Sequence, residues 1–197
     1  MKILNFFVLS MTVVLFFTSC EKIFYYKLTE VDKQMIPYYL GQKISFVDSL
    51  GQPFDLIVTK DTISWNGGDQ EFWEQKVVEL QSKNLDFYIV IVVNEAYASG
   101  QISIFISSIH IHYGIGYDME GNFANFSNTT ICYNNLLINN KIFYDVVRSV
   151  VFYDECDELG NIIGGRHKTS IYYNKTYGIL QLEDKDKVVF TIDTQSE

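Results

Sequence analysis

Two histidines at a spacing of two residues are the first candidates for chemistry in this chain. His110 and His112 lie in a stretch with β character, and alternate residues of a regular strand point to the same side. Paired imidazoles can bind zinc or copper, but a catalytic metal site needs a third ligand. His167 is the only other histidine, and nothing next to the pair supplies that ligand. We therefore expect surface or strand-end histidines and no metal site.

Carboxylates and hydroxyls offer the next candidates. The segment from Asp154 to Glu158 carries four carboxylates that could coordinate calcium, but it lacks the regular ligand spacing of a helix–loop–helix site, so we expect a solvated loop. Ser107 and Ser108 lie close to His110, yet closeness within one strand does not build a catalytic triad. The chain has no Gly-x-Ser-x-Gly motif and no complete dinucleotide fingerprint. The sequence therefore predicts no catalytic residue and no cofactor.

Cys20 has a more specific setting than any of these groups. Lys2 gives the chain a positive start, and the stretch Ile3–Phe17 is almost unbroken apolar sequence. Thr18 and Ser19 then supply the small residues that precede a signal-peptide cleavage point. A plain secretory signal or an uncleaved signal-anchor would share the apolar stretch, although a spanning helix needs about 20 apolar residues and this stretch is shorter.

The tetrapeptide Phe17-Thr18-Ser19-Cys20 resembles the lipobox of bacterial lipoproteins. The resemblance implies that the thiol of Cys20 is diacylated and that residues 1–19 are a signal peptide removed before it. Each buried methylene of an acyl chain contributes about 0.8 kcal/mol, so a cysteine with more than one chain is firmly anchored. We then expect residues 20–28 to be a lipid-anchored tether and 29–197 to form a single domain. Its expected place is the cell envelope, at the outer membrane.

Composition predicts a folded, β-rich domain. The chain has 197 residues and a formal net charge of −9, and removal of Lys2 with the signal peptide takes one positive charge away and leaves −10. An acidic domain repels phosphate, so nucleic acid is excluded as a partner and solubility is the expected use of the charge. With 14 Tyr, 15 Phe and 2 Pro, the chain is rich in β-formers and poor in residues that favour disorder.

Alternating apolar residues predict a series of strands joined by short turns. A capping-box sequence, Thr29 to Asp32, predicts one short helical segment that ends before Pro37. Short turns join only antiparallel neighbours. We therefore expect a mainly all-β fold, an antiparallel meander forming a barrel-like or sandwich domain with one short N-terminal helical segment. The predicted strands are 43–48, 54–65, 71–81, 85–93, 101–113, 130–138, 141–153, 166–173, 178–182 and 188–192.

Several of these segments carry finer predictions. Residues 71–81 fit a helix or a strand, and we favour the strand because 82–84 then makes a compact hairpin turn. In 101–113 the apolar phase flips after Ser107-Ser108, which predicts a β-bulge inside one strand. Residues 114–128 are rich in glycine and asparagine and are expected to form a loop.

The two remaining cysteines could form a disulfide in an exported protein. If Asn139-Asn140 is a hairpin turn, Cys132 lies opposite Val147 and Cys156 lies opposite Phe123. The two sulfur atoms are then beyond the reach of a disulfide. We therefore favour two ordinary thiols and leave the bonded alternative open.

Three stretches together resemble uncharacterised small lipoproteins of Bacteroidetes: the lipobox, Tyr26 to Gly51, and Ile171 to Leu180. The resemblance implies an envelope location and a β-rich domain, and it supplies no catalytic residues. Asp48-Ser49-Leu50 and Asp61-Thr62-Ile63 resemble the Asp-Ser/Thr-apolar sites that these bacteria O-glycosylate. Ser49 and Thr62 are therefore candidate glycosylation sites, although Asp beside Ser or Thr is also common in turns.

These observations favour a non-enzymatic envelope lipoprotein. It would contact the membrane through its N-terminal lipid and bind a ligand, a glycan or a protein partner. A hydrolase acting on an envelope polymer and an accessory subunit of a surface complex are the alternatives. The aromatic content permits an apolar or sugar-stacking groove, although core packing explains it equally well. A concave pocket or an exposed aromatic patch would favour a binding role.

Overall fold

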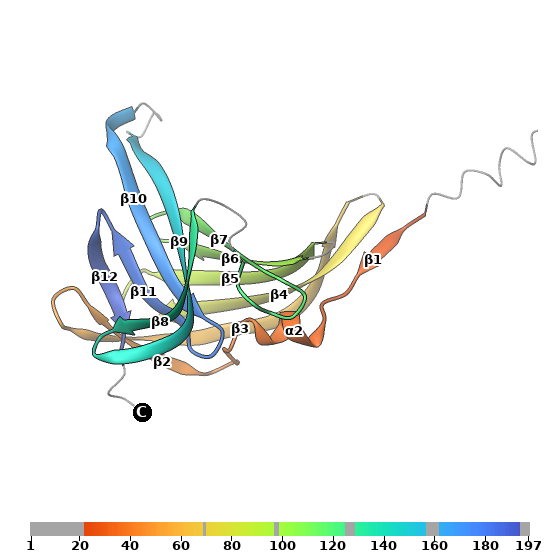
Figure 1. Cartoon of the computed structure of the whole chain (residues 1–197), viewed down its shortest axis with the longest axis horizontal. Coiled ribbons are helices and arrows are strands. Elements are labelled where there is room, and N and C mark those ends of the chain that lie inside the picture. The colour runs from red at the N-terminus through yellow and green to blue at the C-terminus, as the bar shows by residue number, and fades with distance from the viewer. Residues whose placement is uncertain (1–21, 69, 97–98, 125–128, 157–161, 194–197) are drawn as a thin grey trace, which may run out of the picture.

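The computed structural model describes residues 22–68, 70–96, 99–124, 129–156 and 162–193. Within these ranges the chain forms one large sheet that curls into a nearly closed barrel (Figure 1). The mainly all-β prediction is therefore confirmed, with the barrel in place of the sandwich. No helix in the described part of the chain is long and apolar enough to cross a membrane.

The sheet consists of two meanders joined at one pairing. β2 to β7 follow one another as antiparallel neighbours, β8 to β12 do the same, and β12 pairs with β2. β7 and β8 are thus the outer strands, and β1 pairs in parallel with β4 outside this path. The elements are β1 (Phe24–Tyr26), α2 (Glu30–Gln34), β2 (Lys43–Asp48), β3 (Pro53–Gly67), β4 (Glu71–Ser82), β5 (Tyr88–Ala96), β6 (Ser99–Ile106), β7 (Ile111–Tyr117), β8 (Thr130–Ile138), β9 (Lys141–Cys156), β10 (Ile162–Asn174), β11 (Gly178–Asp184) and β12 (Lys187–Ile192).

The interior of the barrel is packed with side chains. Phe46 on β2, Leu56 on β3, Leu80 on β4 and Ile104 on β6 are fully buried at the alternate positions that the sequence predicted to face inward. Burial of one such side chain contributes about 1.5–3 kcal/mol. A side chain links the two ends of the sheet, because the Ser149 hydroxyl on β9 donates to the carbonyl oxygen of Gly114 on the outer strand β7 at 2.9 Å.

Residues 29–38 close one end of the barrel, which we call the closed end. The predicted capping box is confirmed: the Thr29 hydroxyl accepts from the backbone N–H of Asp32, and the Asp32 carboxylate accepts from the backbone N–H of Thr29. The same carboxylate accepts from the Tyr117 hydroxyl at 2.7 Å, and the Tyr173 hydroxyl donates to the carbonyl of Met35. Polar contacts from the barrel wall therefore fix this segment over the interior.

Three hydroxyls of the interior belong to a group that we call the buried tyrosines: Tyr38, Tyr113 and Tyr173. Burial raises the pKa of each phenol above its ordinary value, because the charged form would be cut off from water. Tyr38 accepts a hydrogen bond from the backbone N–H of Ile179 at 2.6 Å. The neutral phenols are thus part of the packed core.

The prediction of one bulged strand over 101–113 is wrong. The stretch is a hairpin, in which β6 ends at Ile106, residues 107–110 form the turn and β7 begins at Ile111. Ile106 and Ile111 are paired and both are buried, so a four-residue turn reverses the parity of the inward positions just as a bulge does. β7 then runs through Tyr117, where a loop was expected from residue 114, because Ile115 and Tyr117 point into the core.

The hairpin predicted at Asn139-Asn140 is confirmed, with positive φ angles of 48° and 63° at the two asparagines. Cys132 lies opposite Val147 as expected, and its sulfur is a thiol. The predicted pairing of Cys156 with Phe123 is wrong, since Cys156 pairs with Ile162 where β9 continues along β10.

Strand β4 of the β3–β4 hairpin pairs at its start with a segment from the expected tether. Residues 71–82 form strand β4, so the choice of a strand over a helix is confirmed. Within the expected tether, Phe24–Tyr26 forms β1 and pairs with the start of β4. The chain is therefore fixed to the sheet from four residues after Cys20.

Candidate ligand-binding site at the open end of the barrel

A pocket of about 390 Å³ opens at the end of the barrel opposite the closed end, and we call it the mouth pocket. Its volume falls in the range of about 300–1,000 Å³ that is typical of small-molecule sites. Phe54, Phe87 and Phe190 form its apolar wall. The remaining lining residues are Asp48, Gln52, Pro53, Asn84, Leu85, Ser108 and Val189.

The turn between β2 and β3 builds one side of this pocket. The Asp48 carboxylate accepts hydrogen bonds from the backbone N–H groups of Leu50 and Gln52, both at 2.8 Å. Gly51 adopts φ +79°, a conformation that favours glycine. The N–H of Ser49 donates to the carbonyl of Val189, which attaches the turn to β12. Asp48 is thus committed to the turn and shapes the rim.

The loop between β4 and β5 builds the opposite side. The Ser82 hydroxyl accepts from the backbone N–H of Leu85, and the N–H of Ser82 donates to the carbonyl of Phe87. This loop occupies residues 83–87, and β5 begins only at Tyr88. The prediction that Leu85 and Phe87 belong to a strand is therefore wrong, and both side chains line the pocket.

Four phenylalanine rings pack together at the base of the mouth pocket. The Phe46 and Phe190 rings meet edge to face with centroids 5.0 Å apart, and Phe54 lies 5.8 Å from Phe190. Phe87 lies 6.0 Å from Phe190 and completes the cluster. Edge-to-face packing of this kind contributes about 0.5–1.5 kcal/mol per pair beyond area burial. The apolar wall is therefore preorganised by the core below it.

The histidines do not form a common site. His110 lies in the β6–β7 turn with φ +51°, and His112 lies on β7, so the prediction of one regular strand carrying both is wrong. Both rings contact Phe105 from the same hairpin. His167 instead packs against Tyr153 on β9. Among the described residues no cluster of three or more His, Cys, Asp or Glu side chains could hold a metal ion.

The other predicted residues are distributed over the surface. Ser49 is exposed in the turn beside the mouth pocket, and Thr62 is exposed on β3. Cys20 and residues 157–158 of the acidic segment lie outside the described residues. Asp154, which was expected in a solvated loop, lies on β9, which continues to Cys156. Burial raises the pKa of the Cys132 thiol, which favours its neutral form.

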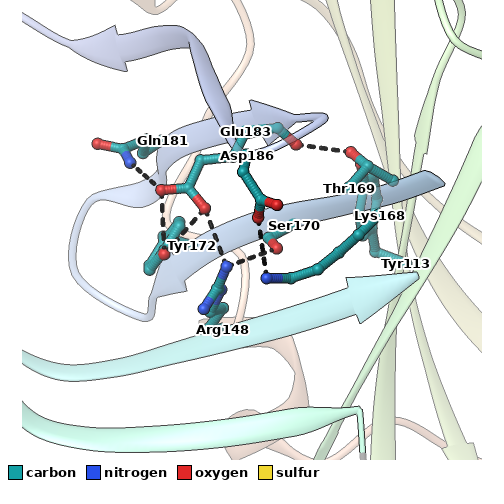
Figure 2. A network of polar contacts seen from close by, with 9 residues as sticks. All are labelled: Tyr113, Arg148, Lys168, Thr169, Ser170, Tyr172, Gln181, Glu183 and Asp186. Atoms are coloured by element: carbon teal, nitrogen blue, oxygen red, sulfur yellow. Dashed lines mark hydrogen bonds and ion pairs between the residues drawn. The ribbon is translucent and has the colours of Figure 1, made fainter. Parts of the chain in front are cut away.

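A network of charged and hydroxyl side chains connects β9, β10 and β11 (Figure 2). Arg148 donates to the carboxylate of Glu183 and to the hydroxyl of Ser170, both at 3.0 Å. The Tyr172 hydroxyl and the Gln181 amide also donate to Glu183. Because these side chains bind one another across three strands, we interpret the network as structural.

A neighbouring pair links this network to the interior. The Thr169 hydroxyl donates to the backbone carbonyl of Glu183 at 2.7 Å, so its only hydrogen is already used. The contact of 2.6 Å between the Thr169 and Tyr113 oxygens therefore has Tyr113 as its donor (Figure 2). Burial is what raises the pKa of the Tyr113 phenol, and it keeps the donor hydroxyl neutral.

A second hollow of about 450 Å³ lies at the seam between β7 and β9. Small residues, among them Gly114 and Ser149, line it, and its wall has no aromatic side chain. Ser99 and Thr129 of its lining adjoin residues 97–98 and 125–128, which lie outside the described residues. The mouth pocket is therefore the better candidate site, because its wall is aromatic and none of its lining residues adjoins a segment outside the described residues.

Comparison of the chain with protein-family models, curated proteins and solved structures finds no match. The function must therefore be argued from the geometry of the pocket and from the sequence.

Proposed function

We propose that this protein is a lipid-anchored binding protein of the bacterial envelope that holds a small apolar ligand in the mouth pocket. The observation that carries the proposal is the apolar wall of Phe54, Phe87 and Phe190 at the open end of a packed barrel. Apolar surface transferred from water into such a site contributes about 25 cal/mol per Å². A flat, ring-containing ligand fits best, because the wall already consists of packed rings.

The polar rim supports the same class of ligand. Asn84, Ser108 and Gln52 border the pocket, and a few polar groups around an apolar wall orient a ligand without making the site hydrophilic. The Asp48 carboxylate accepts through Oδ1 from two backbone N–H groups of its turn, so part of its negative charge is already balanced by these donors. We therefore expect neutral ligands with one or two hydrogen-bonding groups to be preferred over cations.

The anchoring part of the proposal depends on Cys20 and its lipobox. Metabolic labelling with palmitate tests it in the full chain. We expect label in the parent and none in Cys20→Ser, which should also leave the membrane fraction. An unlabelled parent would remove the anchor from the proposal and leave the pocket to be judged separately. The same samples show by mass whether Ser49 and Thr62, which we propose as glycosylation sites, carry sugar.

The binding part is tested with N-phenyl-1-naphthylamine, a neutral aromatic probe whose emission rises in apolar surroundings. Two adjacent valines supply a matched pair: Val189 lines the pocket and is 38% exposed, whereas Val188 is 40% exposed and is not part of the lining. We expect saturable probe binding by the parent. Val189→Glu should weaken it about tenfold or more, which corresponds to 1.4 kcal/mol, because a carboxylate beside an apolar ligand loses hydration.

The control is Val188→Glu, which should bind the probe within about twofold of the parent, a difference well under 1 kcal/mol. Equal weakening by both substitutions, or a parent that shows no saturable binding, would overturn the proposal of a ligand site at the mouth pocket. Urea unfolding of both variants verifies that each is folded.

A further inference from the structure

Exposed apolar side chains gather at the end of the β3–β4 hairpin that is farthest from the mouth pocket. Tyr25 on β1 is 63% exposed and Trp65 on β3 is 46% exposed. Figure 1 shows β1 lying along this hairpin, at the end of the molecule from which the chain leads back to its N-terminus. We call the group the aromatic tip, and its members are Ile23, Phe24, Tyr25, Ile63, Trp65 and Phe72.

The aromatic tip is a built surface. The Tyr25 ring meets Trp65 edge to face at 5.7 Å and stacks on Phe72 at 5.5 Å. The backbone of β1 pairs with β4, and the N–H of Phe24 donates to the carbonyl of Gln70 at 2.9 Å. These contacts hold the rings in place while their outer surfaces stay in water. A cluster of exposed large apolar residues marks an interaction site.

The covalent chain limits how far this surface can lie from Cys20. Phe24 is the fourth residue after Cys20, and an extended chain covers at most about 14 Å over four residues. If Cys20 carries acyl chains in a bilayer, Phe24 is held within that distance of the anchored cysteine, and the rest of the aromatic tip lies next to it. No other surface of the described domain is tied to Cys20 by so short a length of chain.

We propose that the aromatic tip inserts into the headgroup region of the lipid bilayer and fixes the orientation of the barrel on the membrane. The proposal rests on the anchor at Cys20 described above. Trp and Tyr are the residues that favour the membrane–water interface, and Trp65 and Tyr25 are at the centre of the surface. The chain without residues 1–19 carries a formal net charge of −10, which would repel anionic lipid, so the proposed contact depends on the apolar side chains of the tip.

This placement directs the mouth pocket away from the membrane. Phe54 and Trp65 lie on the same strand, eleven residues apart, which corresponds to about 36 Å along β3 at 3.3 Å per residue. With Trp65 in the headgroups, the pocket faces the aqueous side and is open to ligands that arrive from solution.

The test supplies the anchor chemically, so that it does not depend on natural lipidation. The chain from Cys20 to Glu197, which keeps every described residue, carries Cys132→Ser, Cys156→Ser and Trp73→Phe, so that Cys20 is its only thiol and Trp65 its only tryptophan. Cys20 is coupled to a maleimide phospholipid in phosphatidylcholine vesicles. We expect brominated phosphatidylcholine to quench Trp65 emission severalfold, with a blue shift relative to the uncoupled protein.

The matched control moves the only tryptophan to the other end of the barrel. It carries Trp65→Phe and Leu50→Trp in the same background, because Leu50 is exposed in the turn beside the mouth pocket. We expect no quenching at that position. Equal quenching at both positions, or none at Trp65, would overturn the inference. So would a shielded Trp65 in uncoupled protein that elutes as a dimer, since a second copy would then cover the tip. Failure of palmitate labelling in the natural protein leaves this test unaffected.

Discussion

The buried carboxylate of Asp32 offers the sharpest test of how the closed end is held. It is 5% exposed and accepts three hydrogen bonds, from the N–H and the hydroxyl of Thr29 and from the hydroxyl of Tyr117. Asp32→Ala removes all three. Thr29 is exposed, so its N–H and hydroxyl can donate to water after the substitution. Only the capping stabilisation of about 1 kcal/mol is then lost at Thr29.

The Tyr117 hydroxyl loses the carboxylate as its acceptor, and because Tyr117 is fully buried, water does not take the place of that acceptor. A hydrogen bond to a charged group is worth about 1.5–3 kcal/mol. The two losses together predict that Asp32→Ala lowers the free energy of unfolding by about 2.5–4 kcal/mol. Combining it with Tyr117→Phe in a double-mutant cycle should give a coupling energy of about 1.5–3 kcal/mol.

Urea unfolding followed by tryptophan fluorescence measures both quantities. Glu30→Ala is the matched control, because Glu30 lies on the same helix with an exposed carboxylate paired only to Lys33. It should cost less than about 0.5 kcal/mol. If Asp32→Ala is no more destabilising than Glu30→Ala, or if the coupling with Tyr117→Phe is near zero, the reasoning on the closed end is refuted.

Three further predictions concern the buried tyrosines, two glycines and the Arg148–Glu183 pair. Burial raises the pKa of each of the buried tyrosines above the ordinary value of 10.0, so their stabilisation is complete below pH 10 and is lost as the pH rises above it. The free energy of unfolding, measured by urea denaturation, should be level with respect to these groups up to about pH 10 and then fall by about 1.4 kcal/mol per pH unit for each phenol. Gly178→Ala should prevent stable folding, because its Cβ would lie 2.0 Å from the Tyr38 hydroxyl, whereas Gly41→Ala, with a similar φ and open space around it, should cost about 1–2 kcal/mol in thermal or urea unfolding. Glu183→Gln should cost about 3 kcal/mol, because the partly buried charge of Arg148 loses its carboxylate partner, against less than 1 kcal/mol for Asp186→Asn at an exposed pair; equal urea midpoints for the two variants would contradict this.

The sequence predicted most of the sheet because its strands are long and alternate regularly. β2, β3 and β9 begin and end within a few residues of their predicted bounds, and Asn139-Asn140 fixed the register of the β8–β9 hairpin. The capping box at Thr29 was equally local, since both partners lie within one turn of helix. Where the determining contacts are close in the chain, pattern and structure agree.

The errors have a common physical origin in turns whose side chains are apolar. Leu85 and Phe87 continue the apolar alternation of β5, so their residue types predict a strand. The hydrogen bond from the Leu85 N–H to the Ser82 hydroxyl, which fixes the loop, is not visible in that pattern. The four-residue turn at 107–110 reverses the alternation of inward positions, and a bulge within one strand would give the same apolar pattern. The mouth pocket was therefore missed, since one of its walls is the loop that the sequence presented as strand.

The β3–β4 hairpin explains why a chain with a packed interior can still carry both of the surfaces to which we assign a proposed role. Its base, with Phe54, supports the mouth pocket, and its tip, with Trp65, carries exposed aromatic side chains beyond the point where β5 leaves β4. Between them the barrel core and the closed end are fixed by buried side chains and need no ligand. Because β1 replaces β5 as the neighbour of β4 at the tip, the segment that follows Cys20 is itself part of the surface that we place on the membrane. Anchor and orientation would then be set by the same few residues, and the pocket at the far end would be presented to solution as a consequence.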